Sequence, residues 1–390
     1  MEHSRGPSRQ AIARRRTIAV ALIAAIAVAA WWAFIRGDGA DDAVTVPTAV
    51  SPETSDAIAA MTPEQLAEQV LLVGFAGTDP SAGFVEELRS RQLGGVFVRA
   101  ENWADAASGT ALVAALRAAG RGEGRIPPLI VAAQEGGRYR SFGDLPPERT
   151  ELEIGDGGSI DEAEGWAREA AEALRSAGFD LNLFPVADIA TLDSPLGDRA
   201  FSDDPATVTE LTAAAVRGCA AAGLACAAVH FPGLGAASED TDRGQATVGL
   251  DQETLEARDL GPFATAFSEG MPAVGLSLAF YVAYDPATPA ALSARVTTGL
   301  LREGLGFEGV AITDDLGAGA VRAGYSAPKA AVAALAAGAD LIRIDAPGNQ
   351  RGVAEAIVAA VESGSLPLAR LQQAAARVVE LKRTRGLTPM

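Results

Sequence analysis

The chain has 390 residues, of which 48% are hydrophobic and 21% charged, and its formal net charge is −18 at pH 7. This composition excludes a disordered chain and a polytopic membrane protein. Six arginines lie within the first 36 residues, so the rest of the chain is still more acidic and repels nucleic-acid phosphates. Beyond that segment the chain has one histidine, His230, and two cysteines, Cys219 and Cys226. These are too few zinc-binding side chains for most zinc sites.

Three consecutive segments precede the main body of the chain. Residues 1–17 contain a cluster of arginines and are predicted to be a basic cytoplasmic tail. Residues 18–35 are uncharged, and at ~1.5 Å per residue they extend about 27 Å, enough for a transmembrane helix. No clear small-x-small cleavage site follows, so we expect an uncleaved anchor in the cell membrane, with the body of the chain outside the cytoplasm. Residues 36–60 are predicted to be a flexible linker.

From residue 61 to residue 386 the sequence alternates short apolar runs with longer amphipathic stretches. The predicted strands are the apolar runs Val70–Phe75, Gly95–Val98, Leu129–Ala132, Leu181–Val186, Cys226–Phe231, Val274–Ala279, Val310–Thr313 and Leu341–Ile344. The clearest helical patterns are Ala82–Leu93, Asp161–Ala177, Pro205–Ala222, Thr254–Glu269, Ala294–Glu303, Ala327–Ala337 and a final helix over 366–385. Eight apolar strands joined by helices favour a single-domain (β/α)8 barrel, an α/β fold, over an open doubly wound sheet.

The two cysteines lie on either side of Gly223, between a predicted helix and the next strand. Outside the cytoplasm, Cys219 and Cys226 can form a disulfide. Their short separation, which runs from a helix end into a strand, favours two buried thiols instead.

Polar and glycine-rich residues follow several predicted strands, at the end of a barrel where active sites lie. Asp314 follows the seventh strand, and Asp240 and Asp242 lie in the loop after the fifth. Glycoside hydrolysis needs one carboxylate to attack or stabilise the anomeric carbon, and a proton donor for the leaving oxygen. Asp314 is therefore a candidate nucleophile, Asp240 or Asp242 a candidate donor, and Arg199 a candidate ligand for sugar hydroxyls.

The same residues also have structural interpretations. The Asp314-Asp315 pair can cap a helix, and Arg199 can pair with Asp198 or Asp203. A single histidine in a barrel is commonly hydrogen-bonded within the fold. A phosphate-handling barrel is a third alternative, but the loops after the seventh and eighth strands are acidic and lack the basic anion site that it needs.

Six segments, in register along the barrel, resemble the catalytic barrel of glycoside hydrolase family 3, especially the single-barrel bacterial β-N-acetylglucosaminidases. The matching segments are Gln134–Arg138, Pro185–Asp188, Gly197–Phe201, His230–Gly233, Pro289–Ser293 and Leu301–Leu316. The resemblance implies hydrolysis of terminal β-linked N-acetylhexosamine, as in cell-wall glycan, by a retaining mechanism. It assigns the nucleophile to Asp314 and the acid/base pair to Asp240 and Asp242. The substrate-binding residues that it implies are Arg199, His230, Arg138 and Glu135.

The chain departs from the family pattern at five positions of the expected site. A family Asp that grips sugar hydroxyls is Ala133 here, and a substrate-holding Lys is Val229. Three family histidines are replaced by Leu234, Asp242 and Leu278. A lost charged hydrogen bond costs roughly 1–3 kcal/mol, and lost general-acid catalysis typically costs ~10²–10⁴-fold in rate. Asp242 nevertheless offers a carboxyl group where the acid/base His is missing, and most retaining glycosidases use a carboxylic acid. The alternative is that Asp242 is one more solvated acid of the loop.

Two functional hypotheses follow. In the first, the chain is an active, membrane-anchored glycosidase that acts on glycan or muropeptide, with Asp314 and Asp242 as its catalytic carboxyl groups. In the second, it is a catalytically inactive pseudoenzyme that binds glycan or serves as a scaffold on the same barrel. Neither hypothesis includes a metal ion, an organic cofactor or nucleic acid. The first requires the carboxyl groups of Asp314 and Asp242 to face one pocket, because a retaining pair lies ~5–5.5 Å apart.

Overall fold

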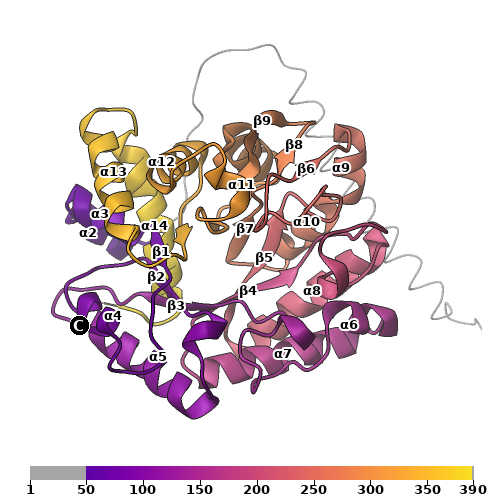
Figure 1. Cartoon of the computed structure of the whole chain (residues 1–390), viewed down its shortest axis with the longest axis horizontal. Coiled ribbons are helices and arrows are strands. Elements are labelled where there is room, and N and C mark those ends of the chain that lie inside the picture. Colours follow the sequence, from indigo (N-terminus) through magenta and orange to yellow (C-terminus); the bar gives the residue numbers. More distant parts are fainter. Residues whose placement is uncertain (1–49, 389–390) are drawn as a thin grey trace, which may run out of the picture. The chain divides into compact units, whose positions relative to one another are not determined.

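The computed structural model describes residues 50–388 of the chain, which belong to one compact unit. Eight parallel strands occur in the order β10-β7-β5-β4-β3-β2-β1-β11, and helices surround them (Figure 1). The strands are β1 (Leu71–Val73), β2 (Gly95–Phe97), β3 (Leu129–Ala132), β4 (Leu181–Val186), β5 (Ala225–Phe231), β7 (Ala273–Leu276), β10 (Val310–Thr313) and β11 (Ile342–Ile344). Each overlaps one predicted apolar run, so the predicted α/β barrel is confirmed.

Helices connect successive strands and cover the outside of the barrel (Figure 1). They are α2 (Pro52–Ala59), α3 (Pro63–Gln69), α4 (Gly83–Leu88), α5 (Ala106–Gly120), α6 (Glu151–Gly157), α7 (Ile160–Ser176), α8 (Pro205–Ala222), α9 (Gln252–Arg258), α10 (Leu260–Ser268), α11 (Gly319–Arg322), α12 (Ala327–Ala337), α13 (Gln350–Glu362) and α14 (Leu368–Thr384). Shorter turns are η1 (Ala100–Asn102), η2 (Gly137–Tyr139), η3 (Gly197–Arg199) and η4 (Ala290–Leu292), and η5 (Arg295–Gly304) is a π-helix. A small second sheet contains β6 (Thr247–Val248), β8 (Phe280–Tyr281) and β9 (Asp285–Pro289).

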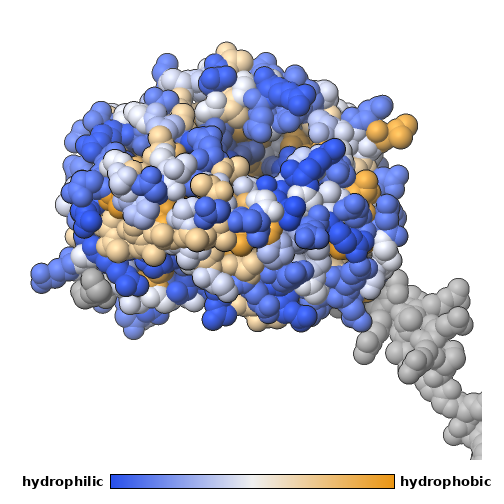
Figure 2. All heavy atoms as spheres, turned by 60° about the horizontal axis from the view of Figure 1, so that its bottom comes forward, coloured by the Kyte–Doolittle hydropathy of each residue, from blue (hydrophilic) through white to orange (hydrophobic). Residues whose placement is uncertain are grey.

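The core consists of the strands and the inner faces of the helices. Every residue of β3, β4, β5 and β10 is buried, as expected for parallel strands that are covered on both faces. The phenylalanines that are fully buried are Phe75, Phe142, Phe184, Phe201, Phe231 and Phe263. The face of the molecule in Figure 2 is mostly hydrophilic, with smaller apolar areas between the polar side chains.

A buried ionic cluster lies where β10 and β11 close the barrel. Asp340 lies two residues before the start of β11 and is completely buried. Its Oδ2 accepts hydrogen bonds from the Ala311 amide (3.1 Å) and from Arg302 (2.5 Å). Its Oδ1 accepts from Arg370 (2.8 Å) and Arg377 (3.1 Å). Burial opposes ionisation, but the three arginines lower the pKa of Asp340, so the carboxylate stays charged and joins η5 and α14 to the barrel.

The helix predicted at Thr254–Glu269 is two helices. α9 ends at Arg258 and α10 begins at Leu260, with Asp259 between them. In one continuous helix the Pro262 ring would clash with the carbonyl group of Arg258 and would supply no amide hydrogen. The proline therefore divides the predicted helix.

The amino-terminal predictions fall largely outside the described residues, including the basic tail 1–17, the anchor 18–35 and the first part of the linker. Among residues 50–388, no helix is both long and apolar enough to cross a bilayer. The last part of the predicted linker forms α2. Glu380 of α14 accepts hydrogen bonds from the Ser51 hydroxyl (2.7 Å) and the Thr54 hydroxyl (2.5 Å), and Thr54 is fully buried.

A disulfide joins Cys219, in the last turn of α8, to Cys226 on β5. Gly223 ends α8 in the left-handed conformation, with a φ of 72°, and reverses the chain. The two Cα atoms are therefore 6.3 Å apart, within the range that a disulfide spans. The prediction of two buried thiols is wrong, because the turn at Gly223 decides how closely the cysteines approach.

We expect the chain, unfolded without reductant, to show no thiol that iodoacetamide can alkylate. The Cys219→Ala/Cys226→Ala variant should lose about 2.5 kcal/mol of unfolding free energy, since the disulfide closes a short loop in the unfolded chain. Mass spectrometry after alkylation and urea unfolding curves measure the two quantities. Two alkylated cysteines in the unreduced protein would contradict the disulfide.

Asp259 is a buried carboxyl group between α9 and α10, with an exposed fraction of only 1%. Neither of its oxygens has a hydrogen-bond partner, and the nearest cation is Arg258 at 3.6 Å. Burial raises the pKa of Asp259 to about 7. Between about pH 4 and pH 7 the folded chain therefore holds a proton that the unfolded chain has released. The stability of the fold should fall as pH rises through this window.

We predict that Asp259→Asn removes this loss of stability, because the amide stays neutral at every pH. At pH 8 the variant should be more stable than the parent chain by about 1–3 kcal/mol. Urea unfolding at pH 5, 6, 7 and 8 measures the slope, and Asp203→Asn, at an exposed residue, is the matched control. An Asp259→Asn variant that keeps the parent's slope would contradict the prediction.

Candidate active site

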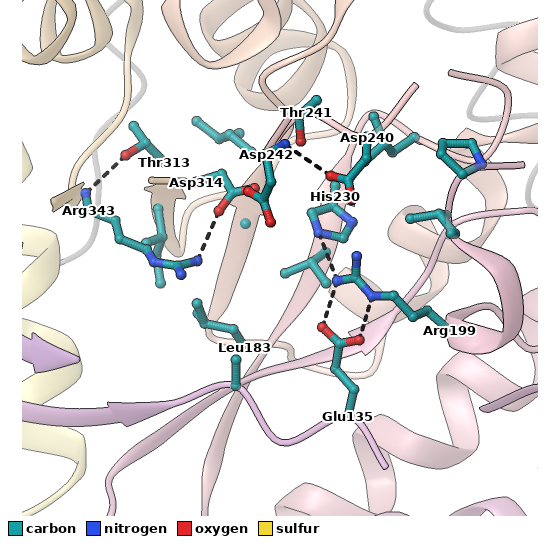
Figure 3. A pocket seen from close by; sticks show the side chains of 18 residues that line it. Glu135, Leu183, Arg199, His230, Asp240, Thr241, Asp242, Thr313, Asp314 and Arg343 are labelled. Atoms are coloured by element: carbon teal, nitrogen blue, oxygen red, sulfur yellow. Dashed lines mark hydrogen bonds and ion pairs between the residues drawn. The ribbon is translucent and has the colours of Figure 1, made fainter. Parts of the chain in front are cut away.

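One pocket opens at the carboxyl ends of the strands, where a barrel places its chemistry (Figure 3). The charged and titratable side chains that line it are Glu135, Arg199, His230, Asp240, Asp242, Asp314 and Arg343. They come from β5 and β11 and from the loops after β3, β4, β5 and β10, so residues up to 208 positions apart in sequence share one cavity.

Asp314 lies directly after β10 and projects into this pocket (Figure 3). Its Oδ1 accepts two hydrogen bonds, from the Asp315 amide at 2.8 Å and from Arg343 Nη1 at 2.9 Å. Burial opposes ionisation, but the positive charges of Arg343 and His230 lower the pKa of Asp314 below its ordinary value. At neutral pH the side chain is therefore a carboxylate.

Asp240 and Asp242 belong to the loop between β5 and β6. The Asp242 amide donates to Oδ1 of Asp240 at 3.0 Å, and the Asp242 side chain extends toward Asp314 at the mouth of the pocket (Figure 3). Partial burial and the negative charges of Asp314 and Asp240 raise the pKa of Asp242. The two carboxyl groups that face each other are thus driven toward opposite protonation states.

The loop is held in this position by α11. The amide of Ala320 donates to the carbonyl oxygen of Thr241 at 3.0 Å, and the amide of Gly319 donates to that of Asp242 at 3.2 Å. Thr241 is 3% exposed. The loop that contains Asp242 is therefore packed against α11.

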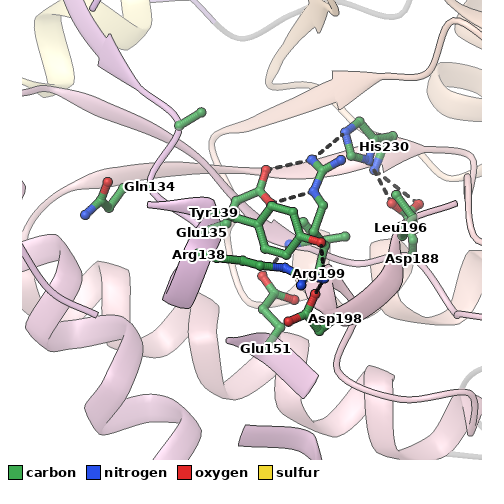
Figure 4. Close-up of polar contacts among 12 residues, drawn as sticks. Gln134, Glu135, Arg138, Tyr139, Glu151, Asp188, Leu196, Asp198, Arg199 and His230 are labelled. Atoms are coloured by element: carbon green, nitrogen blue, oxygen red, sulfur yellow. Dashed lines mark hydrogen bonds and ion pairs between the residues drawn. The ribbon is translucent and has the colours of Figure 1, made fainter. Parts of the chain in front are cut away.

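The opposite wall of the pocket contains an arginine–carboxylate pair (Figure 4). Arg199, at the end of η3, binds Glu135 through two hydrogen bonds of 2.7 Å, Nε to Oε2 and Nη2 to Oε1. Burial opposes its charge, but the Glu135 carboxylate more than offsets this and raises the pKa of Arg199. Arg199 Nη2 also lies 3.5 Å from His230 Nε2. The pair supplies fixed polar groups on the side of the pocket away from Arg343.

His230 is oriented by a buried carboxylate. Its Nδ1 lies 2.7 Å from Oδ2 of Asp188, whose Oδ1 also accepts the Leu234 amide at 2.6 Å. Burial lowers the pKa of His230, but the Asp188 charge outweighs it, and the net shift is upward. The histidine therefore has a structural partner and still presents Nε2 toward Arg199 and the pocket.

Apolar side chains also line the pocket. Val229 on β5 and Ala133 after β3, two of the positions that depart from the family pattern, line the pocket with Leu234. Leu278, the fifth such position, is fully buried but is not part of the lining. The lining therefore combines charged and apolar side chains.

The structure brings together six of the seven residues proposed from the sequence. Arg138 is the exception: it does not line the pocket, its side chain is 68% exposed, and it pairs with Asp198 at 2.5 Å (Figure 4). Arg199 pairs with Glu135 and not with Asp198 or Asp203. Within residues 50–388, no cluster of three or more His, Cys, Asp or Glu side chains is arranged to hold a metal ion.

Sequence reasoning missed Arg343. It lies within β11, in a run predicted from its apolar residues, and its guanidinium group reaches Asp314. The signal was present in the sequence as one charged residue within an otherwise apolar strand, flanked by Ile342 and Ile344. Charged residues inside a buried strand need a partner, and here the partner comes from the neighbouring strand.

The chain forms a closed α/β barrel with two facing carboxyl groups and an arginine at the carboxyl ends of its strands. This arrangement is typical of glycosidase-type barrels. The chain belongs to glycoside hydrolase family 3: residues 62–381 match the family's sequence model, described as the glycosyl hydrolase family 3 N terminal domain.

Sequence and structure comparisons agree with this membership. A β-hexosaminidase of Stenotrophomonas maltophilia (strain K279a) is 36% identical over 288 residues, which cover 71% of this chain and 84% of that protein. A family 3 β-N-acetylglucosaminidase from Paenibacillus sp. FPU-7 superposes with a TM-score of 0.79 and 32% identity, over 84% of this chain and 63% of that one. A β-N-acetylhexosaminidase from Beutenbergia cavernae superposes with a TM-score of 0.73 and 28% identity, over 83% and 99% of the two chains.

Gly319 provides a test of how the Asp242 loop is held. A Cβ atom at this position would lie 2.5 Å from the Arg243 carbonyl oxygen and 2.9 Å from that of Asp242, which is too close for either to remain in place. We predict that Gly319→Ala displaces the loop and speeds hydrogen exchange of its amides about tenfold or more. The unfolding free energy should fall by only about 1–3 kcal/mol.

Exchange over residues 238–246 is measured by mass spectrometry. Gly324→Ala is the matched control, because a Cβ atom there meets nothing within 4 Å. Equal exchange in the two alanine variants would contradict a loop held by close packing on α11.

Proposed function

We propose that this chain hydrolyses terminal β-linked N-acetylhexosamine by a retaining mechanism, with Asp314 as nucleophile and Asp242 as acid/base. The observation that carries the proposal is that these two carboxyl groups face each other in one pocket while their surroundings shift their pKa values in opposite directions. Carboxyl pairs with opposite shifts are the signature of an acid and a nucleophile that share one site. The β-hexosaminidase names of similar proteins support the substrate class.

In the first step, Asp314 Oδ2 donates an electron pair to the anomeric carbon, and the bond to the leaving oxygen breaks. The leaving oxygen takes the proton of Asp242, so a glycosyl ester of Asp314 forms and Asp242 becomes a carboxylate. In the second step, water gives a proton to Asp242 and adds to the anomeric carbon, and Asp314 departs as a carboxylate. Arg199, fixed by Glu135, is placed to bind sugar hydroxyls or the acyl carbonyl group.

The proposed location is the outer face of a cell membrane, with cell-wall glycan or muropeptide as substrate. The uncharged run at 18–35, preceded by arginines, supports an anchor with its amino terminus inside. The disulfide between Cys219 and Cys226 supports an oxidising compartment for the barrel.

A second candidate function is an inactive glycan-binding module. The observation that favours it is that Ala133 and Val229 line the pocket and offer no partner to sugar hydroxyls. Each missing charged hydrogen bond weakens sugar binding by roughly 1–3 kcal/mol. In this case the barrel would bind glycan without cleaving it.

Purified full-length chain is to be assayed with an aryl β-N-acetylglucosaminide and a panel of other aryl β-glycosides. We expect hydrolysis that Asp314→Asn reduces by about 10³-fold or more, and that Asp242→Asn reduces by about 10²–10⁴-fold. Asp203→Asn, which removes an exposed carboxylate, is the matched control and should be unchanged.

The rate should rise with pH as Asp314 ionises, below an ordinary aspartate pKa, and fall again as Asp242 loses its proton, above that value. An absence of hydrolysis across the panel, together with saturable muropeptide binding by calorimetry, would support the inactive module instead.

A further inference from the structure

The guanidinium group of Arg343 is held in the pocket by two carboxylates and an aromatic ring. It lies on β11, and its backbone amide donates to the hydroxyl oxygen of Thr313 on β10 at 3.0 Å. Its Nε and Nη2 donate to the two carboxylate oxygens of Asp345, at 2.9 and 2.7 Å. The centre of the guanidinium group lies 4.1 Å from the centroid of the Phe97 ring. A carboxylate and an aromatic face together fix its orientation.

One guanidinium nitrogen remains for the pocket, and it points at the candidate nucleophile. Nη1 donates to Asp314 Oδ1 at 2.9 Å, and the Asp315 amide donates to the same oxygen at 2.8 Å (Figure 3). Neither contact involves Oδ2. The two donors thus hold one carboxylate oxygen and leave the other free to form a bond.

We propose that Arg343 is a positioning residue for the nucleophile, which holds Asp314 by Oδ1 so that Oδ2 faces the anomeric carbon. The role rests on the proposed function, since it presupposes that Asp314 attacks a sugar. The family resemblance does not assign this role, because Arg343 lies outside the six matching segments. It stands in an apolar strand, between Ile342 and Ile344.

The charges around Asp314 show why one arginine matters. The charged groups that act on it are Arg343 on β11, His230 on β5, Arg199 on η3 and Asp242 on the loop after β5. The carboxyl groups of Asp315 and Asp345 lie next to Arg343. The Asp242 carboxyl group disfavours a charged Asp314, as does the burial of Asp314. Among the side chains that favour the charge, Arg343 has the largest effect, and it is the one that donates a hydrogen bond to the carboxylate, beside the Asp315 backbone amide.

Arg343 acts on both chemical steps. When Oδ2 bonds to the anomeric carbon, Oδ1 becomes the carbonyl oxygen of an ester, and the Arg343 hydrogen bond to it persists. When water replaces the ester, Asp314 regains its charge next to Arg343, which stabilises it as the leaving group. Removal of Arg343 should therefore slow breakdown of the ester more than its formation.

The direct test is the titration of Asp314 in the full chain, followed by carboxyl ¹³C NMR and assigned by comparison with Asp314→Asn. In Arg343→Met we expect the Asp314 titration midpoint to rise by about one pH unit or more, equivalent to a tenfold change in proton affinity. Arg343→Lys keeps the charge without the planar fork and should give an intermediate midpoint. Arg322→Met, at an exposed arginine of α11, is the matched control.

An unchanged Asp314 midpoint in folded Arg343→Met would overturn the proposal. If that variant does not fold, the same midpoint in Arg343→Lys as in the parent chain would overturn it equally. The titration needs no activity, so a shifted midpoint in a chain that hydrolyses nothing would support the role of Arg343 while refuting the proposed function. In an active chain, the acid limb of kcat/KM should move with the Asp314 midpoint.

Discussion

The structure depends on closure of the barrel between β10 and β11. These two strands share few backbone hydrogen bonds, and the buried Asp340 carboxylate supplements them by accepting the Ala311 amide and three arginines. A buried charge is tolerated only when it is paired and hydrogen-bonded. At the opposite end of the same strands lie Asp314 and Arg343. One seam therefore holds a structural ionic cluster at its base and the ion pair of the pocket at its top.

Closure also explains the electrostatics of the pocket. Parallel strands in a ring bring all their carboxyl ends to one place, so residues distant in sequence meet there. Carboxylates gathered in this way repel one another. The cations of the pocket are distributed unevenly among them, so the carboxyl groups of Asp314 and Asp242 have different pKa shifts. Arg343 favours the charged form of Asp314, whereas Asp242 has carboxylates as its nearest charged neighbours. This asymmetry, and not the number of acids, shifts the pKa values of the two carboxyl groups in opposite directions.

The sequence predicted what depends on local patterns. Eight apolar runs became eight strands, and residues directly after strand ends, such as Asp314, entered the pocket. Features that depend on pairing between distant segments were not predictable. Arg343 was not predicted as a site residue because its partner, Asp314, follows a different strand. Arg138 belongs to a matching family segment, but its side chain is exposed to solvent. The disulfide required the reversal at Gly223, a turn geometry that spacing alone does not specify.

The use of Asp242 in place of a histidine has a consequence for the proposed reaction. An unperturbed imidazole has a pKa of ~6.5. A carboxyl group reaches a similar pKa only when its neighbours raise it. One of those neighbours is Asp314, whose charge disappears when it forms the glycosyl ester. The pKa of Asp242 should then fall, just as its task changes from donating a proton to accepting one from water. In the proposed reaction the charge of Asp314 therefore controls the protonation state of Asp242, and no histidine is needed as the acid.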